Sequence, residues 1–377
     1  MRKALLMAAA SVAILLAGFA FPRRNSVRAD VPGAQASAQN TETAKLLEGF
    51  AAIEPIDTHT HAFHNDPAFA AMLTRLHLHL LDIIVADDHN IFRSLVTERA
   101  SARAFIAGTD GHAILCTTFD PFSFEKPGFA GRAIQQINDD FSRGAVAVKI
   151  WKNIGMEIKK TDGTYVMPDD PIFEPIYQDI AAHHKTLIAH LAEPSSCWEP
   201  PNPQSPDYSY YKENPQWYMY LHPDHPSKQT ILSARDHLLE MNPKLRVVGA
   251  HLGSMETDLD EIAAHFDRYP NFAVDTAARM EYLMIQPREK ARAFLIKYQD
   301  RVLYGTDSEF LVNESAADAL KDWQDTYARD WKFLATDEML DYHGRKIEGL
   351  KLPPSVLKKI FHDNAVQWIP GILGPGK

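Results

Sequence analysis

The chain has 377 residues, of which 45% are hydrophobic and 23% charged, and its formal net charge at pH 7 is −10. That length permits one large α/β domain or two ordinary ones, and the composition is typical of a globular enzyme. The negative charge argues against nucleic acid as a partner and favours a small molecule.

The N-terminal residues have the layout of a secretory signal. A basic start, Arg2 and Lys3, precedes an uncharged apolar run over residues 4–21, and small residues that follow offer a cleavage site. We therefore expect residues 1–29 to direct export to the periplasm or out of the cell. The alternative is an uncleaved membrane anchor, because the run is just long enough to span a bilayer. Only in that case do we expect contact with a membrane.

Residues 30–44 are rich in Ala, Gln, Ser and Thr, a composition that predicts a disordered linker. The folded domain is then expected over residues 45–377. Cys116 lies in an apolar run and is expected to be buried, whereas Cys197 lies in a predicted loop. The sequence therefore permits a disulfide without indicating one.

From residue 53 onward, short β-rich apolar runs alternate with segments of helical periodicity. The predicted strands lie within 53–64, 81–86, 113–119, 145–151, 186–191, 245–252, 272–275 and 301–307. The predicted helices are 92–106, 131–141, 172–184, 227–241, 256–266 and 287–298. This alternation predicts a single-domain (β/α)8 TIM barrel.

Polar side chains interrupt the predicted strands at one place, their C-terminal ends. They are His59 and His61 after the first strand, Lys149 on the fourth, His190 on the fifth, His251 on the sixth and Asp307 on the eighth. In a (β/α)8 barrel these ends converge on one mouth, where active sites lie. A single polar residue at a strand end is commonly a cap, but recurrence on five strands favours a shared site. Alternation along residues 145–150 also turns Lys149 inward.

The first strand contains Asp-Thr-His-Thr-His at residues 57–61. Since successive strand residues point to opposite faces, His59 and His61 share a face and can hold one metal ion between them. Neutral imidazoles suit zinc or a similar divalent ion, but the remaining ligands must come from elsewhere. A second pair, His77 and His79, alternates with leucines, and there an amphipathic segment with a polar face is the better interpretation.

Several motifs follow one another along the chain. They are Ile-Asp-Thr-His-Thr-His at 56–61, His190 after an apolar strand, Val-Gly-Ala-His-Leu-Gly at 248–253, Tyr-Pro-Asn-Phe-Ala-Val-Asp-Thr at 269–276, Leu-Tyr-Gly-Thr-Asp at 303–307 and Asn364-Ala365 near the end. In these motifs the chain resembles the amidohydrolase superfamily, in particular its amidohydrolase-related branch. The resemblance covers residues 53–369 and is more specific for the superfamily than for a substrate.

The resemblance implies a metal-dependent barrel hydrolase. Its ligands would be His59, His61, His190 and Asp307. His251 matches a histidine that binds a second metal in some members and contacts substrate in others, and Lys149 matches a lysine that is carboxylated in two-metal members. Either one or two divalent ions are therefore expected, with zinc favoured and manganese or iron as alternatives.

The expected chemistry is hydrolysis of a C–N or C–O bond in an amide, lactone or ester. Asp307 would accept a proton from the attacking water and pass it to the leaving group. His251 would polarise a carbonyl oxygen. One alternative is a metal-dependent decarboxylase of an aromatic or unsaturated acid, in which Lys149 is structural. A second is a non-catalytic metal-binding protein, although no expected ligand is missing.

The loop over residues 193–226 is rich in Tyr, Trp and Pro and predicts a lid over the barrel mouth, which would suit an apolar or ring-bearing substrate. An alternative of equal weight is that these aromatic side chains pack the loop onto the barrel or form a subunit contact, so a homo-oligomer is possible. Arg279 is a candidate anchor for a substrate carboxylate, but a structural arginine is the favoured interpretation. Residues 151–153 either line the pocket or cap the next segment.

Overall fold

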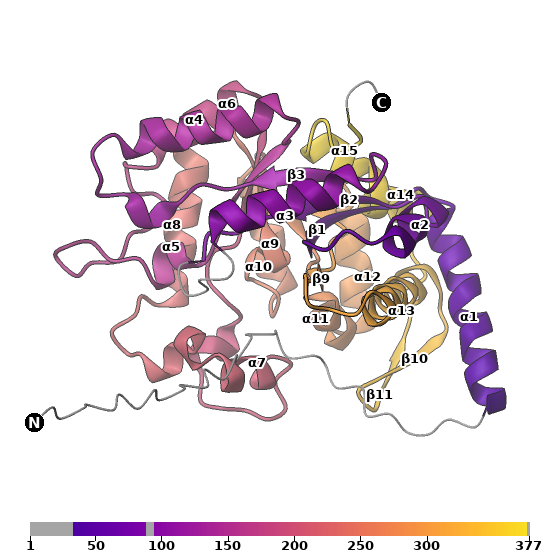
Figure 1. Cartoon of the computed structure of the whole chain (residues 1–377). Coiled ribbons are helices and arrows are strands. Elements are labelled where there is room, and N and C mark those ends of the chain that lie inside the picture. The colour runs from indigo at the N-terminus through magenta and orange to yellow at the C-terminus, as the bar shows by residue number, and fades with distance from the viewer. Residues whose placement is uncertain (1–32, 88–93, 375–377) are drawn as a thin grey trace, which may run out of the picture.

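The structure is a computed structural model that describes residues 33–87 and 94–374 (Figure 1). The signal or anchor predicted for residues 1–29 lies outside the described residues, as does the start of the helix predicted from residue 92. In the described part of the chain, no helix has both the length and the apolar character that a membrane span requires.

The central sheet has nine strands, and a separate hairpin has two. The sheet strands are β1 (Ile56–Ala62), β2 (His79–Ile83), β3 (Ala113–Thr117), β4 (Ala147–Ile150), β5 (Thr186–Ala189), β6 (Arg246–Gly249), β7 (Phe272–Asp275), β8 (Val302–Leu303) and β9 (Ser308–Phe310). The hairpin consists of β10 (Met339–Tyr342) and β11 (Arg345–Glu348).

Helices lie around this sheet (Figure 1). They are α1 (Gly33–Ala51), α2 (Pro67–Arg75), α3 (Leu95–Ala107), α4 (Phe129–Ser142), α5 (Asn153–Met156), α6 (Glu174–Ala182), α7 (Tyr208–Glu213), α8 (Lys228–Met241), α9 (Ala250–Gly253), α10 (Leu259–Arg268), α11 (Met280–Ile285), α12 (Arg288–Lys297), α13 (Ala316–Ala335), α14 (Pro354–Lys358) and α15 (Asn364–Trp368). Each predicted strand and helix corresponds to one of these elements within a few residues.

Strands β1 to β8 pair in chain order, and every pair is parallel. The ring closes where the Thr58 amide donates to the Tyr304 carbonyl at 2.9 Å and where β9 pairs with β1. The predicted (β/α)8 barrel is therefore confirmed. All C-terminal strand ends consequently meet at one mouth.

Two apolar layers sandwich the barrel wall, as expected for a parallel sheet covered by helices. Ala147 belongs to the inner cluster with Ile83 and Val248. Val148 and Ile150 belong to the outer cluster that packs against the helices. Lys149, on the same strand face as Ala147, is only 1% exposed, so the predicted inward orientation of its side chain is confirmed.

Asp57 ties the first strand to the segment that closes the barrel. Its carboxylate accepts hydrogen bonds from the Thr306 amide (3.0 Å) and hydroxyl (2.6 Å) and from the Tyr327 hydroxyl (3.0 Å). The pairing of β1 with β2 shifts register between Asp57 and Thr60. These contacts hold Thr306, the residue before Asp307, against Asp57, which lies two residues before His59.

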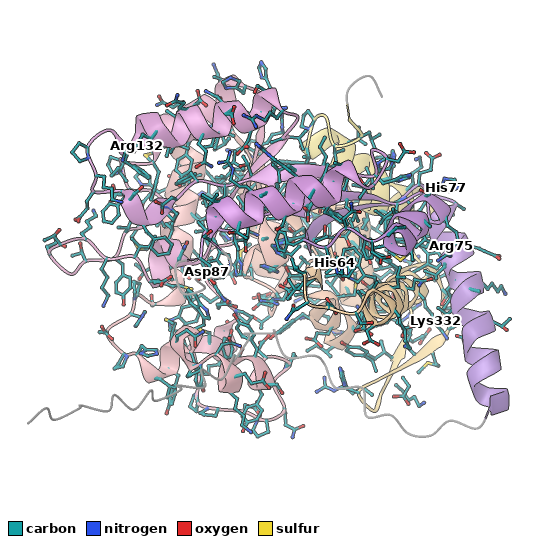
Figure 2. All side chains as sticks on the ribbon, viewed as in Figure 1. His64, Arg75, His77, Asp87, Arg132 and Lys332 are labelled. Carbon is teal, nitrogen blue, oxygen red and sulfur yellow. The ribbon has the colours of Figure 1, made fainter. Side chains whose placement is uncertain are left out.

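The disordered linker predicted for residues 30–44 is wrong from Gly33 onward, because those residues form the start of α1. Ala, Gln, Glu, Lys and Leu all favour helix, and a composition-based prediction of disorder overlooks that preference. Helix α1 also finds a partner in α13. Phe50 stacks on Tyr327 with ring centroids 4.9 Å apart, and Lys332, labelled in Figure 2, pairs with Glu42 at 2.5 Å.

Both cysteines are buried and free in the described structure. Cys116 lies on β3 inside the barrel, as predicted. Cys197 lies in the short helical turn η2 (Ser195–Trp198), where its thiol donates to the Trp217 carbonyl at 3.0 Å. Each cysteine is therefore part of local packing.

Replacing Phe50 tests whether α1 belongs to the folded domain. Its ring is fully buried against Tyr304, Tyr327, Trp331 and Phe361. We expect Phe50→Ala to lower the free energy of unfolding by about 3–5 kcal/mol, measured by urea denaturation. Glu42→Gln, which removes only an exposed partner, is the control and should cost less than about 1 kcal/mol. A Phe50→Ala protein as stable as the parent would contradict this packing.

Candidate metal centre

The side chains of His59, His61 and Asp307 meet at the barrel mouth. The Nε2 atoms of both histidines lie 3.4 Å from Oδ1 of Asp307. Their three candidate ligand atoms all lie within 4.8 Å of one another, the only such group among the residues that the structure describes. The expectation that the two histidines share a face and converge with the eighth-strand aspartate is met by this geometry.

The hydrogen bonds behind these rings decide which nitrogen faces the centre. His59 Nδ1 donates to Asp275 at 2.8 Å, and His61 Nδ1 donates to the Ile83 carbonyl at 2.7 Å. In neutral imidazoles this leaves both Nε2 atoms as acceptors. Two lone pairs thus face a carboxylate oxygen with no proton between them. A divalent cation is the group that such a set of acceptors fits.

Asp275, at the end of β7, was not predicted as a site residue. Its second oxygen accepts from the backbone amides of His251 (2.8 Å) and Ala277 (3.1 Å). One fully buried carboxylate therefore orients the His59 ring and anchors the turn that carries His251. The other site residues were predicted because they are polar side chains at the C-terminal ends of strands. Asp275, the last residue of β7, meets the same criterion.

Lys149 points directly at this centre. Its Nζ lies 3.0 Å from His59 Nε2 and donates to it. Burial lowers the pKa of Lys149 to about 8, despite the opposing effect of Asp275 and Asp307. A small cavity of about 10 Å³ adjoins this lysine, and Trp151 and Asn153 are among its lining residues. The amine can therefore lose its proton at moderately alkaline pH.

His190 and His251 form a second pair beside the first. His251 Nδ1 donates to the Ala277 carbonyl at 2.9 Å, so its Nε2 is an acceptor and lies 3.2 Å from His190 Nδ1. The ring centroids of His59 and His251 are 4.9 Å apart. A neutral His251 held in this way cannot donate from Nε2 to a carbonyl oxygen. It is suited instead to act as a metal ligand.

The turn after β6 gives His251 its orientation. His251, Leu252, Gly253 and Ser254 all have positive φ angles, of 59°, 55°, 64° and 57°. The left-handed region is costly for residues with a side chain, and such strain persists where the surroundings impose it. Asp275 imposes it here through the His251 amide.

The electrostatics of the centre favour neutral histidines and an ionised aspartate. Burial lowers the pKa of His59 and holds those of His190 and His251 well below the usual range. Burial opposes ionisation of Asp307, but a proton at this centre is held by His251, His61 or His59 in preference to the carboxyl group, so the pKa of Asp307 lies far below normal. Asp307 is also the most accessible of the three grouped ligands, with 29% of its side chain exposed, so it faces the mouth.

A charged network lies immediately beside His190. Lys152 forms a buried ion pair with Glu193 and also donates to the Tyr210 hydroxyl at 2.6 Å. Arg279 lies 3.7 Å from both Glu193 and Glu256. Because Arg279 is buried between two carboxylates, the structural interpretation of this arginine holds. Glu193 has no local signal in the sequence that marks it as a site residue.

The predicted lid packs on the barrel through its own aromatic side chains. Tyr211, Trp217 and Tyr218 are buried, and the rings of Trp217 and Trp151 lie 5.2 Å apart. Tyr220 is an exception at 46% exposed. Of the two interpretations offered for this loop, packing onto the barrel describes most of these aromatic residues.

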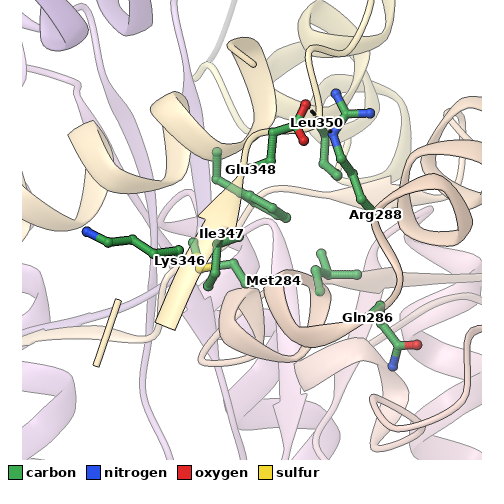
Figure 3. Close-up of a pocket in the computed structure, with 9 residues that line it drawn as sticks. Met284, Gln286, Arg288, Lys346, Ile347, Glu348 and Leu350 are labelled. Atoms are coloured by element: carbon green, nitrogen blue, oxygen red, sulfur yellow. Dashed lines mark ion pairs between the residues drawn. The ribbon is translucent and has the colours of Figure 1, made fainter. Parts of the chain in front are cut away.

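The other features are remote from the centre. His77 is exposed and His79 begins β2, at the end of the strand opposite the mouth, so the amphipathic interpretation of that pair is confirmed. A cavity of about 180 Å³ lies between α11, α12 and β11, with Met284 and Ile347 in its wall and the Arg288–Glu348 ion pair at its edge (Figure 3). None of the candidate ligands lines it.

The sequence profile described as "Amidohydrolase" matches residues 125–370. The chain belongs to the amidohydrolase family. The match contains Lys149, His190, His251 and Asp307, whereas the first-strand histidines precede it. Amidohydrolases are enzymes that use divalent metal ions and act on small molecules, in agreement with the His-His-Asp group at the mouth.

Several solved structures are distantly similar to this chain. A 2,6-dihydroxybenzoate decarboxylase from Rhizobium is 13% identical, with 84% of this chain and 98% of that chain covered and a TM-score of 0.49. A dihydroorotase from Campylobacter jejuni is 12% identical, with 83% and 82% covered and a TM-score of 0.43. A probable 2-pyrone-4,6-dicarboxylic acid hydrolase from Acinetobacter baumannii is 10% identical, with 84% and 99% covered and a TM-score of 0.44. The search of curated proteins gives no significant match.

The low pKa of His190 predicts a pH dependence of stability. Below about pH 6.5 the unfolded chain binds a proton on this ring that the folded protein does not, so stability is lost as the pH falls. We expect His190→Gln to remove this contribution, making the slope shallower by about 1.4 kcal/mol per pH unit below about pH 6. Urea denaturation of chelator-treated protein at a series of pH values measures it. Parallel slopes for the parent and the variant would contradict a neutral, buried His190.

Proposed function

We propose that this amidohydrolase is a metal-dependent hydrolase that cleaves a C–N or C–O bond in a small amide, lactone or ester. One observation carries the proposal: Lys149 Nζ lies 3.0 Å from His59 Nε2, and its charge acts on Asp307, His190 and His251 as well. A lysine at that point, with a pKa of about 8, is placed to serve both the His59/His61/Asp307 group and the His190/His251 pair. It is not a remote structural residue.

In the proposed assignment, His59, His61 and Asp307 would hold one divalent ion, and His190 and His251 would hold a second. Lys149, once its amine has taken up CO2 and released a proton, would supply an anionic carbamate as a further ligand. A bound ion lowers the pKa of water to near neutrality and polarises a carbonyl group. Zinc is the favoured ion because the donors are mostly imidazoles, although manganese and iron accept the same set.

The protein's own groups then handle protons and orientation. Asp307 is ionised and faces the mouth, so its carboxylate can accept a proton from the attacking water. The water oxygen bonds to the carbonyl carbon, the C–N or C–O bond breaks, and Asp307 returns the proton to the leaving group. Asp275 keeps His59 in the tautomer that presents Nε2.

A decarboxylase is the second candidate, and one observation favours it. The Lys149 amine donates a hydrogen bond to His59 Nε2, so an unmodified lysine also fits this place beside the histidines. An unmodified lysine would leave a single ion on the histidines and Asp307. We retain hydrolysis as the principal proposal because the orientation of His251 suits ligation of a second ion. We also propose export of the protein, on the basis of residues 1–29.

Metal content separates the two candidates. Elemental analysis should find about two ions per chain in the parent, and one or none in Lys149→Ala, because the carbamate ligand is lost. One ion in both proteins would make Lys149 a bystander and favour the decarboxylase. Lys185→Ala, which removes a lysine remote from the mouth, is the matched control and should leave the metal content unchanged.

The role of Asp307 is tested by Asp307→Asn. The amide cannot accept a proton from water, so turnover of a hydrolysable ester or amide should fall by about 100-fold or more. Steady-state kinetics on metal-loaded protein, with the metal content checked in parallel, measures this. Full turnover in the variant with metal still bound would rule out the proposed role.

A further inference from the structure

His190 Nδ1 faces the other histidine of its pair, and the hydrogen bonds around the two rings determine which nitrogen carries the proton. His251 Nε2 is an acceptor, because its Nδ1 donates to the Ala277 carbonyl. The 3.2 Å contact between these rings therefore requires a proton on His190 Nδ1. His190 Nε2 is then a buried acceptor, and it has no hydrogen-bond partner in the described structure.

For His190 to offer its Nδ1 lone pair to an ion, its proton must move to Nε2. The group that faces Nε2 is the carboxylate of Glu193, whose Oε1 lies 3.7 Å away. Glu193 is as buried as the histidine, with 4% of its side chain exposed. A carboxylate that accepts from the outer nitrogen is the usual means by which a protein fixes a ligating histidine.

The lid holds Glu193 in place. Lys152 pairs with Glu193 and donates to the Tyr210 hydroxyl on α7 at 2.6 Å. The Lys152 ammonium also lies 4.5 Å from the centroid of the Trp217 ring. On its other oxygen, Glu193 accepts from the Tyr211 hydroxyl at 3.5 Å. Three lid aromatics thus contact the ion pair that faces His190.

We propose that Glu193 is a positioning residue that couples the packed lid to metal binding at His190. When the lid is packed, Lys152 and Tyr211 hold the carboxylate towards Nε2 and favour the tautomer that leaves Nδ1 free. Linkage makes this coupling reciprocal, so a bound ion stabilises the packed lid. The inference rests on the proposed function to the extent that His190 must be a metal ligand.

The competing explanation is that Glu193 serves only as the counter-charge of buried Lys152. Removing one partner of a buried ion pair destabilises a protein, so Glu193→Gln alone does not separate the two roles. The double variant Glu193→Met/Lys152→Met removes both charges and both acceptor oxygens of residue 193. It leaves no buried charge unpaired, and it offers no acceptor to His190 Nε2.

The test measures Zn²⁺ affinity by chelator competition and hydrogen exchange in peptides from residues 195–221, with and without Zn²⁺. For the parent we expect tight binding and slower exchange in the lid when Zn²⁺ is bound. In the double variant we expect about 10- to 100-fold weaker affinity for at least one ion and loss of the metal-dependent protection. Tyr210→Phe should shift both readouts in the same direction by a smaller factor. Glu199→Gln, which changes an exposed lid carboxylate, is the control.

The outcomes distinguish this inference from the function on which it rests. If the parent binds no Zn²⁺, both are wrong. If the parent binds Zn²⁺ and the double variant matches it in affinity and lid protection, the proposed metal centre stands and Glu193 is only a counter-charge. A double variant that binds Zn²⁺ more weakly, and whose Co²⁺-loaded form has an altered visible spectrum, supports the positioning role.

Discussion

The centre depends on an unfavourable contact that the fold maintains. When both imidazoles are neutral, two nitrogens that carry lone pairs lie 3.4 Å from the Asp307 carboxylate, and none of the three groups can donate to another. A hydrogen bond holds each residue in place. His59 donates to Asp275, His61 donates to the Ile83 carbonyl, and the Asp307 amide donates to the His59 carbonyl. A divalent cation would be held by all three atoms, so this fixed arrangement suits metal binding.

The barrel supplies that scaffold through a few buried carboxylates. Asp57 fixes the closing segment to β1, and Asp275 fixes both His59 and the left-handed turn at His251. Each carboxylate lies at full burial, where unpaired charge is expensive, and each is surrounded by donors. The same arrangement recurs at Glu193 beside His190, with the lid supplying the donors. A buried acid therefore orients His59 and the turn that carries His251, whereas backbone carbonyls accept from the rings of His61 and His251.

The positions of most site residues are predictable from the sequence, because parallel strands of a barrel place their C-terminal ends together. That rule brought His59, His61, Lys149, His190, His251 and Asp307 to one mouth, as the structure has them. Asp275 obeys the same rule and was overlooked. The tautomer of His251 could not be predicted, because it depends on a carbonyl 26 residues away in the chain. Glu193 has no local signal, since its partners come from a loop of irregular structure. Helix α1 does not follow from composition alone, because a composition typical of disorder can still contain residues that favour helix.

The most direct test of the metal centre is the position of an anomalous scatterer. A crystal of the protein grown with Zn²⁺ should give an anomalous difference peak about 2.1 Å from Nε2 of both His59 and His61 and within about 2.2 Å of the Asp307 carboxylate. A second peak bound by His190 and His251 would complete the two-ion arrangement. A crystal with no peak at His59 and His61, or with the Lys149 amine still in contact with His59 at saturating Zn²⁺, would contradict the account.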